Sequence, residues 1–233
     1  MTNKEFVRLL ENISKMKTYY IKGGFGLVLN ASGKKRAINQ YKYNADRADK
    51  INALDPHTFG FDCCGLVKGA LWGFTGDSRK TYGGAVYKAN ALDDVNESGL
   101  LKLCKDVSTD MKNIIPGELL YMSGHCGVYA GDGKVIESTP SGKCGVQITD
   151  FKRVKWTKHG KLPIVIYEET QVISKPSTSV DKPAAQYYVV KRNDNLTKIA
   201  LKYGYKDYKA LLKLNPGIKN PNLIFVGQRI RIK

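Results

Sequence analysis

Long apolar runs are missing from this sequence of 233 residues. No segment approaches the ~20 consecutive apolar residues with which a helix crosses a bilayer, so membrane insertion is excluded. Residues 1–21 carry scattered charges and no uninterrupted apolar core, unlike a secretory signal peptide. We therefore expect a folded protein that is made in the cytoplasm without a secretion signal.

Acidic residues are scarce beside basic ones: 21 Asp and Glu stand against 38 Lys and Arg, which gives a net charge of +17. Such an excess predicts attraction to a polyanion, but it does not choose among nucleic acid, anionic lipid and the teichoic acids of bacterial walls. Residues 187–233 hold eleven basic and two acidic residues, a net +9, so more than half of the excess lies there. No DNA- or RNA-binding motif accompanies the charge, which argues against a nucleic-acid partner.

Histidine and cysteine are also few, with three of the first and five of the second. An odd number of cysteines without a secretion signal argues against a disulfide framework, and leaves at least one thiol for packing or chemistry. A zinc site is disfavoured, because no pair shows the spacing of a zinc knuckle and adjacent cysteines rarely ligate one ion. We expect no metal and no cofactor. The cysteines are Cys63, Cys64, Cys104, Cys126 and Cys144.

The order of the elements indicates an α+β fold. Helical spacing of apolar residues predicts an opening helix over 3–17 and a second helix from Asp62. Residues 25–60 are polar and without clear periodicity, and are interpreted as a long surface excursion. Glycine-rich turns then separate short runs that predict an antiparallel meander, with strands at 118–123, 125–130, 134–138, 145–149 and 162–167.

A change in composition marks a domain boundary. Residues 171–186 are rich in Pro, Ser and Thr and poor in large apolar side chains, which is typical of a linker. We therefore expect one domain at 1–170 and a second at 187–233. The smaller domain is predicted to be a βααβ unit, with two short helices between an opening and a closing strand.

The most informative segment is 61–67 (FDCCGLV). Asp62 is a favourable N-cap, and a cysteine in the first turn lies at the positive end of the helix dipole, which favours the thiolate. The free N–H groups of that turn can also donate to an oxyanion on an attacked carbonyl. At about 100° per residue, Cys63 falls on the apolar stripe while Cys64 lies roughly a quarter turn away, towards Lys68. On the pattern alone, two buried structural thiols are an equally good interpretation.

A base for such a nucleophile is available at His125, at the start of a predicted strand. If residues 131–133 form a three-residue hairpin loop with a glycine bulge, Ala130 pairs with Lys134. Glu137 then lies on the same face as His125 and can hold the imidazole as the third member of a Cys-His-acid triad. The alternative is that both are solvated surface residues.

Three ordered motifs resemble those of the NlpC-type cysteine peptidases, close relatives of the CHAP amidases. Residues 62–67 (DCCGLV) resemble the Asp-Cys-Ser-Gly-Phe/Leu-Val signature of that family. Residues 116–119 (PGEL) and 124–129 (GHCGVY) resemble its Pro-Gly-Asp-Leu and Gly-His-Val-Gly-Ile-Tyr segments. Residues 20–24 (YIKGG) resemble the Tyr-Val-Trp-Gly-Gly element that precedes the nucleophile.

The resemblance implies a papain-like core in which Cys63 is the nucleophile, His125 the base and Glu137 the third polar residue. It also implies that Tyr20 and Asp62 contact the substrate. The chain departs from the family pattern in three ways: a glutamate replaces the commoner histidine, a second cysteine replaces a serine, and a long insertion separates the glycine pair from the nucleophile. The mechanism is unaffected by these departures, but the substrate preference is left open.

Residues 187–233 resemble a LysM module over their whole length. The segment 188–200 tracks the pattern Tyr-x-Val-x-x-Gly-Asp-x-Leu-x-x-Ile-Ala, with Asn193 in place of the glycine, and 224–230 tracks Ile-x-x-Gly-Gln-x-Ile/Leu. Asparagine also accepts left-handed backbone angles. Such modules bind N-acetylglucosamine-containing glycans in a groove between two loops. The residues implied in glycan binding are Asp194, Asn195, Leu196, Asn222, Leu223 and Ile224.

Together the resemblances predict a peptidoglycan hydrolase of the phage endolysin type, made in the host cytoplasm and acting at the bacterial cell wall. It would cleave an amide bond of the stem peptide. Its partners would be that stem, the N-acetylglucosamine glycan and anionic wall polymers, with no nucleic acid and no membrane insertion. Three alternatives stay open: an N-acetylmuramoyl-L-alanine amidase with the same site, a non-catalytic wall-binding protein and a basic nucleic-acid binder.

Overall fold

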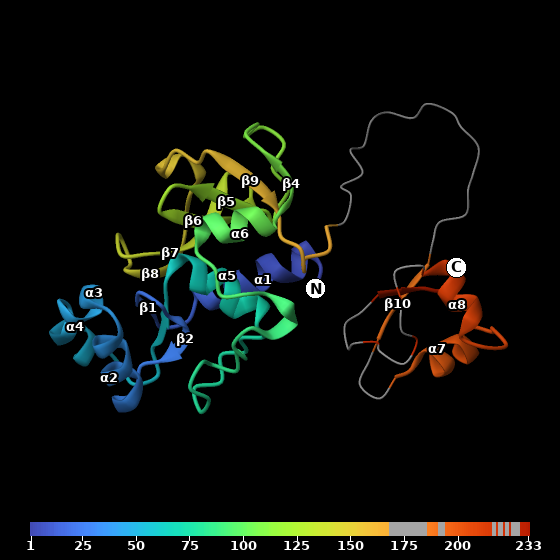
Figure 1. Ribbon diagram of the computed structural model, residues 1–233, viewed down its shortest axis with the longest axis horizontal. Helices are drawn as coiled ribbons and strands as arrows, with labels where there is room; N and C mark the ends of the chain where they lie inside the picture. Colours follow the sequence, from blue (N-terminus) through green and yellow to red (C-terminus); the bar gives the residue numbers. More distant parts are fainter. Residues whose placement is uncertain (168–185, 191–193, 216–217, 219–220, 222–223, 225–228) are drawn as a thin grey trace. The chain divides into compact units, whose positions relative to one another are not determined.

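The computed structural model (Figure 1) describes residues 1–167, 186–190, 194–215, 218, 221, 224 and 229–233. The chain divides into two compact units, Thr2–Glu169 and Thr170–Lys233. Among the described residues, no helix has the length and apolar character needed to cross a membrane.

The N-terminal unit combines helices with two sheets, which confirms the α+β class. Its helices are α1 (Asn3–Ser14), α2 (Ala31–Gln40), α3 (Lys42–Ala45), α4 (Ala48–Asn52), α5 (Cys63–Leu71) and α6 (Glu97–Leu103), with 3₁₀ turns η1 (Ala89–Ala91) and η2 (Phe151–Arg153). A three-stranded sheet has the order β1-β3-β2 and consists of β1 (Thr18–Tyr20), β2 (Phe25–Val28) and β3 (Phe59–Phe61). A six-stranded antiparallel sheet has the order β4-β9-β5-β6-β7-β8 and consists of β4 (Lys105–Ser108), β5 (Leu119–Met122), β6 (His125–Gly131), β7 (Lys134–Thr139), β8 (Gly145–Asp150) and β9 (Lys158–Lys161).

Helix α5 lies at the centre of this unit, with α1 beside it and the six-stranded sheet behind it (Figure 1). All nine of its residues are buried, so it is apolar on every side apart from one lysine. Helix α1 is amphipathic, and it begins at a capping box in which Thr2 and Glu5 each satisfy the backbone N–H of the other. It buries one face, which includes Phe6 and Leu10, against the main core.

Two glycines let the backbone of the β2 segment pack directly onto α5. A Cβ atom on Gly65 would lie 1.8 Å from the carbonyl oxygen of Gly24. A Cβ atom on Gly69, one turn later, would lie 2.5 Å from the carbonyl oxygen of Phe25. Both separations are too short for any side chain, so this face of the helix requires glycine.

The β6–β7 hairpin has the predicted strand register but a different loop. Val128 lies opposite Ile136, as the three-residue loop required. The pairing of Ala130 with Lys134 was wrong, because Gly131 is the partner of Lys134 and the loop has only two residues. The register shifts between Tyr129 and Gly131, so an extra residue in β6 compensates for the shorter loop. Residues on the side of the bulge away from the loop, which include His125 and Glu137, therefore keep the faces that the sequence predicted.

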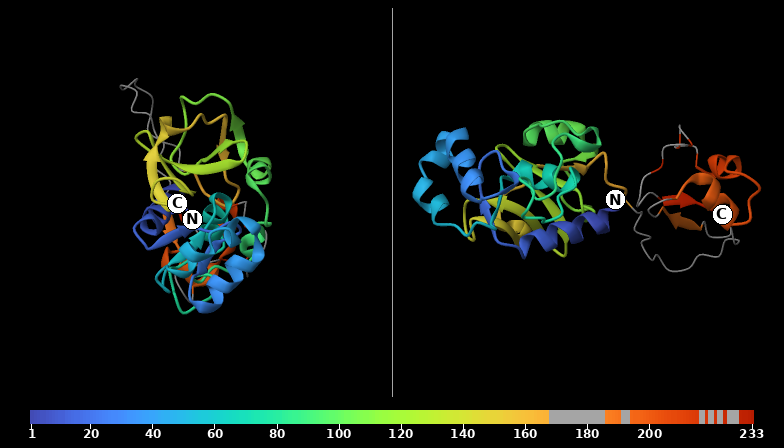
Figure 2. Two further views of the ribbon diagram at one scale, coloured as in Figure 1. Left: turned by 90° about the vertical axis from the view of Figure 1, so that its left-hand side faces the viewer. Right: turned by 90° about the horizontal axis from the view of Figure 1, so that it is seen from below.

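Residues 25–60 are not a surface excursion, and that expectation was wrong. They contain the strands β2 and β3 and the helices α2, α3 and α4. The three helices lie together at one end of the unit (Figure 2). Short helices with exposed polar faces hid the few buried positions from a periodicity analysis. A small core of their own holds them to the β1–β2 turn; it consists of Ile21, Leu27, Leu29, Ala37 and Ile51.

The strand predicted over 162–167 was also wrong. The sixth strand of the large sheet is β9, which ends at Lys161. The segment that follows forms a turn, and Ile166 makes only an isolated bridge to Thr2. Pro163 has no N–H group to contribute to a ladder, which is consistent with the end of the strand before it.

The C-terminal unit has the predicted βααβ order. Strand β10 (Tyr187–Val189) pairs antiparallel with β11 (Arg229–Arg231), and α7 (Leu196–Lys202) and α8 (Lys209–Leu214) lie between them in sequence. The two helices and two strands enclose a small core: Tyr188, Val190, Leu196, Ile199, Ala200, Leu211, Ile230 and Ile232. Most of the linker predicted at 171–186 lies outside the described residues.

Asn44 is the polar link between the α2–α4 segment and the β1–β2 turn. It is 1% exposed, accepts a hydrogen bond from Lys22 N, and donates to the carbonyl oxygens of Lys22 and Ala37. We predict that Asn44→Ala lowers the free energy of unfolding by about 1–3 kcal/mol, because it leaves buried backbone groups unsatisfied. Asn39→Ala, at an exposed position of α2, is the matched control and should change stability by less than about 0.5 kcal/mol. Urea unfolding measures both, and equal losses would contradict the role given to Asn44.

Candidate active site

The first turn of α5 is fixed by the carboxylate of Asp62. Its Oδ1 atom accepts the N–H of Gly65 at 2.6 Å, which confirms the predicted N-cap. Its Oδ2 atom accepts the N–H of Gly23 at 2.7 Å. Burial, followed by the charge of the adjacent Cys63, raises the pKa of Asp62 to about 6 against the lowering effect of these two bonds. One carboxylate thus holds the β1–β2 turn against the helix end that carries Cys63.

His125 and Glu137 face each other across the β6–β7 ladder, as the register predicted. His125 Nε2 lies 2.5 Å from Glu137 Oε2. The imidazole is also close enough to the Cys63 sulfur for each group to shift the pKa of the other. Because Nε2 is engaged by the carboxylate, Nδ1 is the nitrogen left for the thiol. The ring also stacks on Trp156, with centroids 5.6 Å apart. The structure therefore brings Cys63, His125 and Glu137 into one line of contacts.

Glu137 is not the solvated residue of the alternative interpretation, because its side chain is fully buried. Its Oε1 atom accepts hydrogen bonds from the Arg153 guanidinium, the shorter at 2.6 Å, and from the Thr149 hydroxyl. Burial raises the pKa of Glu137, but the hydrogen bonds from His125, Arg153 and Thr149 outweigh it, so the pKa lies below its ordinary value. This carboxyl is therefore ionised beside the imidazole.

Sequence reasoning missed Arg153, Thr149 and Trp156. Thr149 lies on β8 and is paired with Val135, beside the register position of Glu137, so a correct β7–β8 pairing would have indicated it. Arg153 and Trp156 lie in η2 and the loop that follows, where no periodic pattern specifies direction.

The electrostatics favour an ion pair between nucleophile and base. Burial lowers the pKa of His125, but its contacts with Cys63 and Glu137 outweigh burial and raise the pKa to about 9. Hydrogen bonds from the Cys126 and Cys64 thiols and from His125 hold the pKa of Cys63 far below its ordinary value, against the effect of burial. At neutral pH the site therefore holds a thiolate beside an imidazolium.

The predicted quarter-turn offset of Cys64 from the apolar stripe does not make it less buried than Cys63. Cys63 and Cys64 are almost equally buried, at 8% and 7% exposure, and both belong to the main core. Cys64 Sγ lies 3.9 Å from Cys63 Sγ and 3.7 Å from the sulfur of Cys126, which is fully buried on β6. The angular argument assumed one inward face, but α5 is enclosed on all sides. Three thiols thus meet where α5 packs on β6.

A cleft of about 640 Å³ opens in front of this helix end. Tyr20 and Asp62, the two residues expected to contact a substrate, both line it, with Cys63, Cys64 and Lys68. Burial and the charge of Cys63 raise the pKa of Tyr20, so its phenol stays protonated. The volume is in the range of pockets that enclose small organic ligands or a short peptide.

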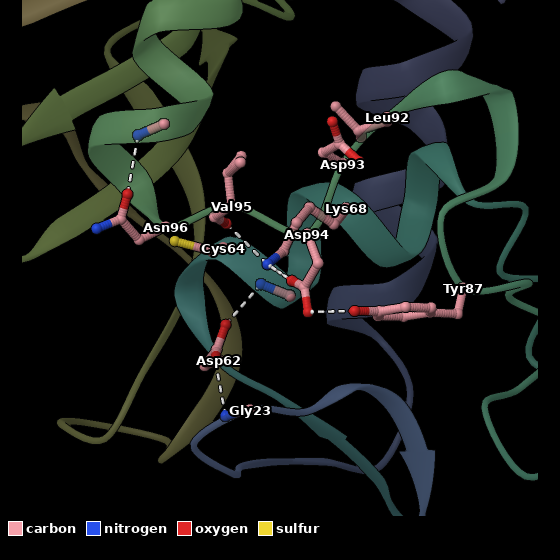
Figure 3. Close-up of polar contacts among 12 residues, drawn as sticks. Gly23, Asp62, Cys64, Lys68, Tyr87, Leu92, Asp93, Asp94, Val95 and Asn96 are labelled. Carbon is pink, nitrogen blue, oxygen red and sulfur yellow. Dashed lines mark hydrogen bonds and ion pairs between the residues drawn. The ribbon is translucent and has the colours of Figure 1, made fainter.

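One wall of the cleft is held by a buried lysine (Figure 3). Lys68 extends from α5, forms an ion pair with Asp94 and donates to the Val95 carbonyl oxygen at 2.8 Å. Asp94 also accepts a hydrogen bond from the Tyr87 hydroxyl at 3.1 Å. Cys64 lies on the same helix and also lines the cleft. These contacts fix the segment before α6 as the border of the cleft.

The arrangement has the parts required for nucleophilic attack on a carbonyl group. The Cys63 thiolate can add to the carbon, and N–H groups at the start of a helix that are not used by its cap can donate to an oxyanion. The protonated His125 can donate to a leaving group, and Glu137 and Trp156 hold its ring. Cys64 and Cys126 offer sulfur atoms that could also contact a metal ion.

The residues predicted to bind a glycan have mixed positions in the C-terminal unit. Leu196 is buried in the core, and Asn195 caps α7 by accepting from Lys198 N at 2.8 Å. Asp194 accepts a hydrogen bond from the Tyr188 hydroxyl at 2.8 Å. Asn195 therefore stabilises the start of α7, and Asp194 connects it to Tyr188 of β10. Ile224 packs at the edge of the core, and the predicted ligands at 222 and 223 lie outside the described residues.

Comparison with known families gives two matches. The profile of the NlpC/P60 family matches residues 38–164, and the profile of the LysM domain matches residues 188–233. The first match includes Cys63, His125 and Glu137, whereas Tyr20 lies before its start.

Among curated proteins, the endolysin of Bacillus phage B103 is 51% identical over 59 residues, which are 25% of this chain and 20% of that protein. The endolysin of Bacillus phage PZA is 58% identical over 45 residues, 19% of this chain and 17% of that protein. A chlorophenol reductase of Desulfitobacterium hafniense is 51% identical over 59 residues, 25% of this chain and 18% of that protein. The chain thus spans about a fifth of the length of these relatives. Among solved structures, NlpC1 from Trichomonas vaginalis has a TM-score of 0.39 and 15% identity, and covers 69% of this chain and 44% of that one.

The ion pair predicts how Cys63 reacts with iodoacetamide. We expect alkylation of Cys63 to persist to acidic pH, because its thiolate persists there, with a further change near the His125 pKa of about 9. Cys104, whose pKa is raised to about 12 by burial, should react only slowly. In Glu137→Gln the imidazolium loses its anionic partner, so the His125 step should move to lower pH.

The second buried Glu–His pair supplies the matched control. Glu118 contacts His159 on β9, and Glu118→Gln should leave the pH profile of Cys63 unchanged. Peptide mass spectrometry of timed alkylation measures each rate, and circular dichroism checks folding. An unmoved step in folded Glu137→Gln would show that another group controls the imidazole.

Proposed function

Because the chain belongs to the NlpC/P60 family of cysteine peptidases and ends in a LysM domain, we propose that it hydrolyses an amide bond in the stem peptide of bacterial peptidoglycan. The observation that carries the proposal is that Cys63 lines a cleft and has the hydrogen-bonded pair of His125 and Glu137 beside it, all three inside the region that matches the family. Two of the similar proteins carry the name endolysin, and this similarity supports the bacterial cell wall as the substrate.

The proposed reaction has two steps. The Cys63 thiolate adds to the amide carbonyl, and the His125 imidazolium protonates the leaving amine as the C–N bond breaks. Water, deprotonated by the now neutral His125, then attacks the thioester; the C–S bond breaks, the carboxylic acid product is released, and the Cys63 thiolate and His125 imidazolium are restored. Glu137 acts through the imidazole, so its role is positioning and charge stabilisation.

Tyr20 and Asp62 would contact the substrate from the cleft wall. Both line the cleft beside Cys63. The oxygens of Asp62 already accept two backbone N–H groups, so we propose that it contributes mainly negative charge to the subsite. A protonated amine on the stem peptide would complement that charge, and the Tyr20 hydroxyl remains protonated to donate or accept a hydrogen bond.

The LysM domain would hold the enzyme on its insoluble substrate. LysM domains bind peptidoglycan, and the loop between β10 and α7 would form one side of the glycan groove. Because Leu196 is buried and Asn195 caps a helix, we propose that this loop contacts the sugar chiefly through its backbone and Asp194. The net charge of +9 over 187–233 would add attraction to anionic wall polymers. The site of action would therefore be the cell wall.

Fragments released from purified peptidoglycan test the bond. Mass spectrometry should show new amino termini within the stem peptide, and their sequence identifies the bond cut. Free lactyl groups on muramic acid would instead identify an amidase with the same catalytic residues. Walls that release no peptide material, with a protein shown to be folded, would contradict hydrolysis altogether.

Substitution separates the two adjacent cysteines. We predict that Cys63→Ala abolishes release of peptide fragments, because it removes the attacking sulfur. Cys64→Ser should retain most activity, because serine keeps a hydrogen-bond donor beside Cys63. Turbidity loss of wall suspensions measures the rate, with thermal unfolding to confirm folding. Comparable losses from both substitutions would refute the assignment of the nucleophile.

Truncation separates chemistry from attachment. Residues 1–175 should keep activity on soluble muropeptides and lose much of it on whole walls, because tethering raises the effective concentration at an insoluble substrate. Residues 187–233 should sediment with peptidoglycan, with a salt-sensitive part that falls as charges are screened beyond about 8–10 Å. If they fail to sediment even at low salt with walls stripped of teichoic acid, the glycan proposal is wrong.

A further inference from the structure

Three sulfur atoms converge at the junction of α5 and β6. Those of Cys63, Cys64 and Cys126 all lie within 4.8 Å of one another, and all three residues are buried. Only Cys63 has a part in the proposed reaction. The other two are a second cysteine in the helix turn and a strand residue from 62 positions later, which the fold brings to Cys64 Sγ at 3.7 Å.

The separations match those of sulfur atoms that share one metal ion. For tetrahedral coordination with metal–sulfur bonds of about 2.3 Å, neighbouring sulfur atoms are about 3.8 Å apart. Cys64 Sγ lies 3.7 Å from Cys126 Sγ and 3.9 Å from Cys63 Sγ. Only the third edge, between Cys63 and Cys126, would have to adjust, within its upper bound of 4.8 Å. Thiolate donors of this kind select thiophilic ions rather than Mg²⁺ or Ca²⁺.

We propose that Cys63, Cys64 and Cys126 form a binding site for a thiophilic d¹⁰ cation of the Zn²⁺ class, and that the bound ion blocks the nucleophile. Cys63 binds as the thiolate that it already is, and Cys64 and Cys126 each release a proton to solvent as their metal–sulfur bonds form. His125, next to Cys63, offers Nδ1 as the fourth ligand once the imidazolium has also released its proton to solvent. The sequence argument against a metal site rested on spacing along the chain, and it did not foresee that β6 would deliver a third sulfur.

The ion has a route to the site, because Cys63 and Cys64 both line the cleft. The carboxylates of Asp62 and Glu137 lie next to Cys63 and His125 and offset the charge of a cation. With its sulfur bound, Cys63 cannot attack a carbonyl group, so the metal would inhibit reversibly. This consequence rests on the proposed function, whereas binding itself does not.

Titration of the full chain with Cd²⁺ tests the site, in a phosphine reductant that does not compete for the ion. We expect one Cd²⁺ per chain and a sulfur-to-metal charge-transfer absorption equal to that of three thiolates. Zn²⁺ should displace the band stoichiometrically. If the charge-transfer absorption of the unsubstituted protein corresponds to only one thiolate bound to Cd²⁺, the proposal is wrong, and this result requires no variant.

Variants separate this site from simple capture of the ion by the nucleophile and base. Cys126→Val and Cys64→Ser should each weaken Cd²⁺ affinity by at least roughly 10-fold, and lower the absorption to two thiolates. Cys104→Ser, on a cysteine outside the cluster, should change neither. Circular dichroism confirms folding, and Cys126→Ala replaces Cys126→Val if the latter does not fold.

Unchanged affinity in both folded variants would overturn the proposal. The readout is metal binding, so it stays informative if wall hydrolysis is never found. If Zn²⁺ inhibits fragment release, and Cys126→Val loses this inhibition together with its metal affinity, then metal binding at this site blocks hydrolysis. Inhibition at equal Zn²⁺ concentrations in that variant and the unsubstituted protein would refute the blocking step alone.

Discussion

The geometry of the site depends on the carboxylate of Asp62. It joins two segments that are 39 residues apart in sequence, since Gly23 and Gly65 donate to its two oxygens. An N-cap that satisfied only its own helix would leave the β1–β2 turn free to shift. With both bonds made, Tyr20 and the first turn of α5 are held as one wall of the cleft, and Cys63 has a fixed position on it. The burial that this requires is reflected in the raised pKa of Asp62.

A second carboxylate, Glu137, has the opposite electrostatic outcome. Its side chain is fully buried whereas Asp62 is half-buried, but Arg153, Thr149 and His125 all donate to it, so its pKa falls although burial alone would raise it. An ionised and fully hydrogen-bonded carboxylate costs much less to bury than an unpaired one. The position of the Glu137 carboxylate is therefore well defined, and its hydrogen bond in turn fixes the orientation of the His125 imidazole.

Local patterns predicted much of the fold and the centre of the site. The Asp62 cap and the β6–β7 register depend on residues close together in sequence, and both could be deduced. The contact of Cys64 with Cys126 could not, because it depends on how α5 packs against the sheet. The same holds for Arg153, whose direction is set by a 3₁₀ turn with no repeating pattern. The helices of 25–60 were missed because few of their positions are buried, so polarity concealed their periodicity.

The glycine face of α5 has a consequence for how the enzyme could be altered. Because carbonyl oxygens of Gly24 and Phe25 contact Gly65 and Gly69 directly, backbone atoms alone set the spacing between turn and helix. A single methyl group at either glycine would therefore displace the helix from the turn. A displacement of ~1 Å can lower a reaction rate by about 10²-fold. Active variants selected after random mutagenesis should therefore retain glycine at both positions.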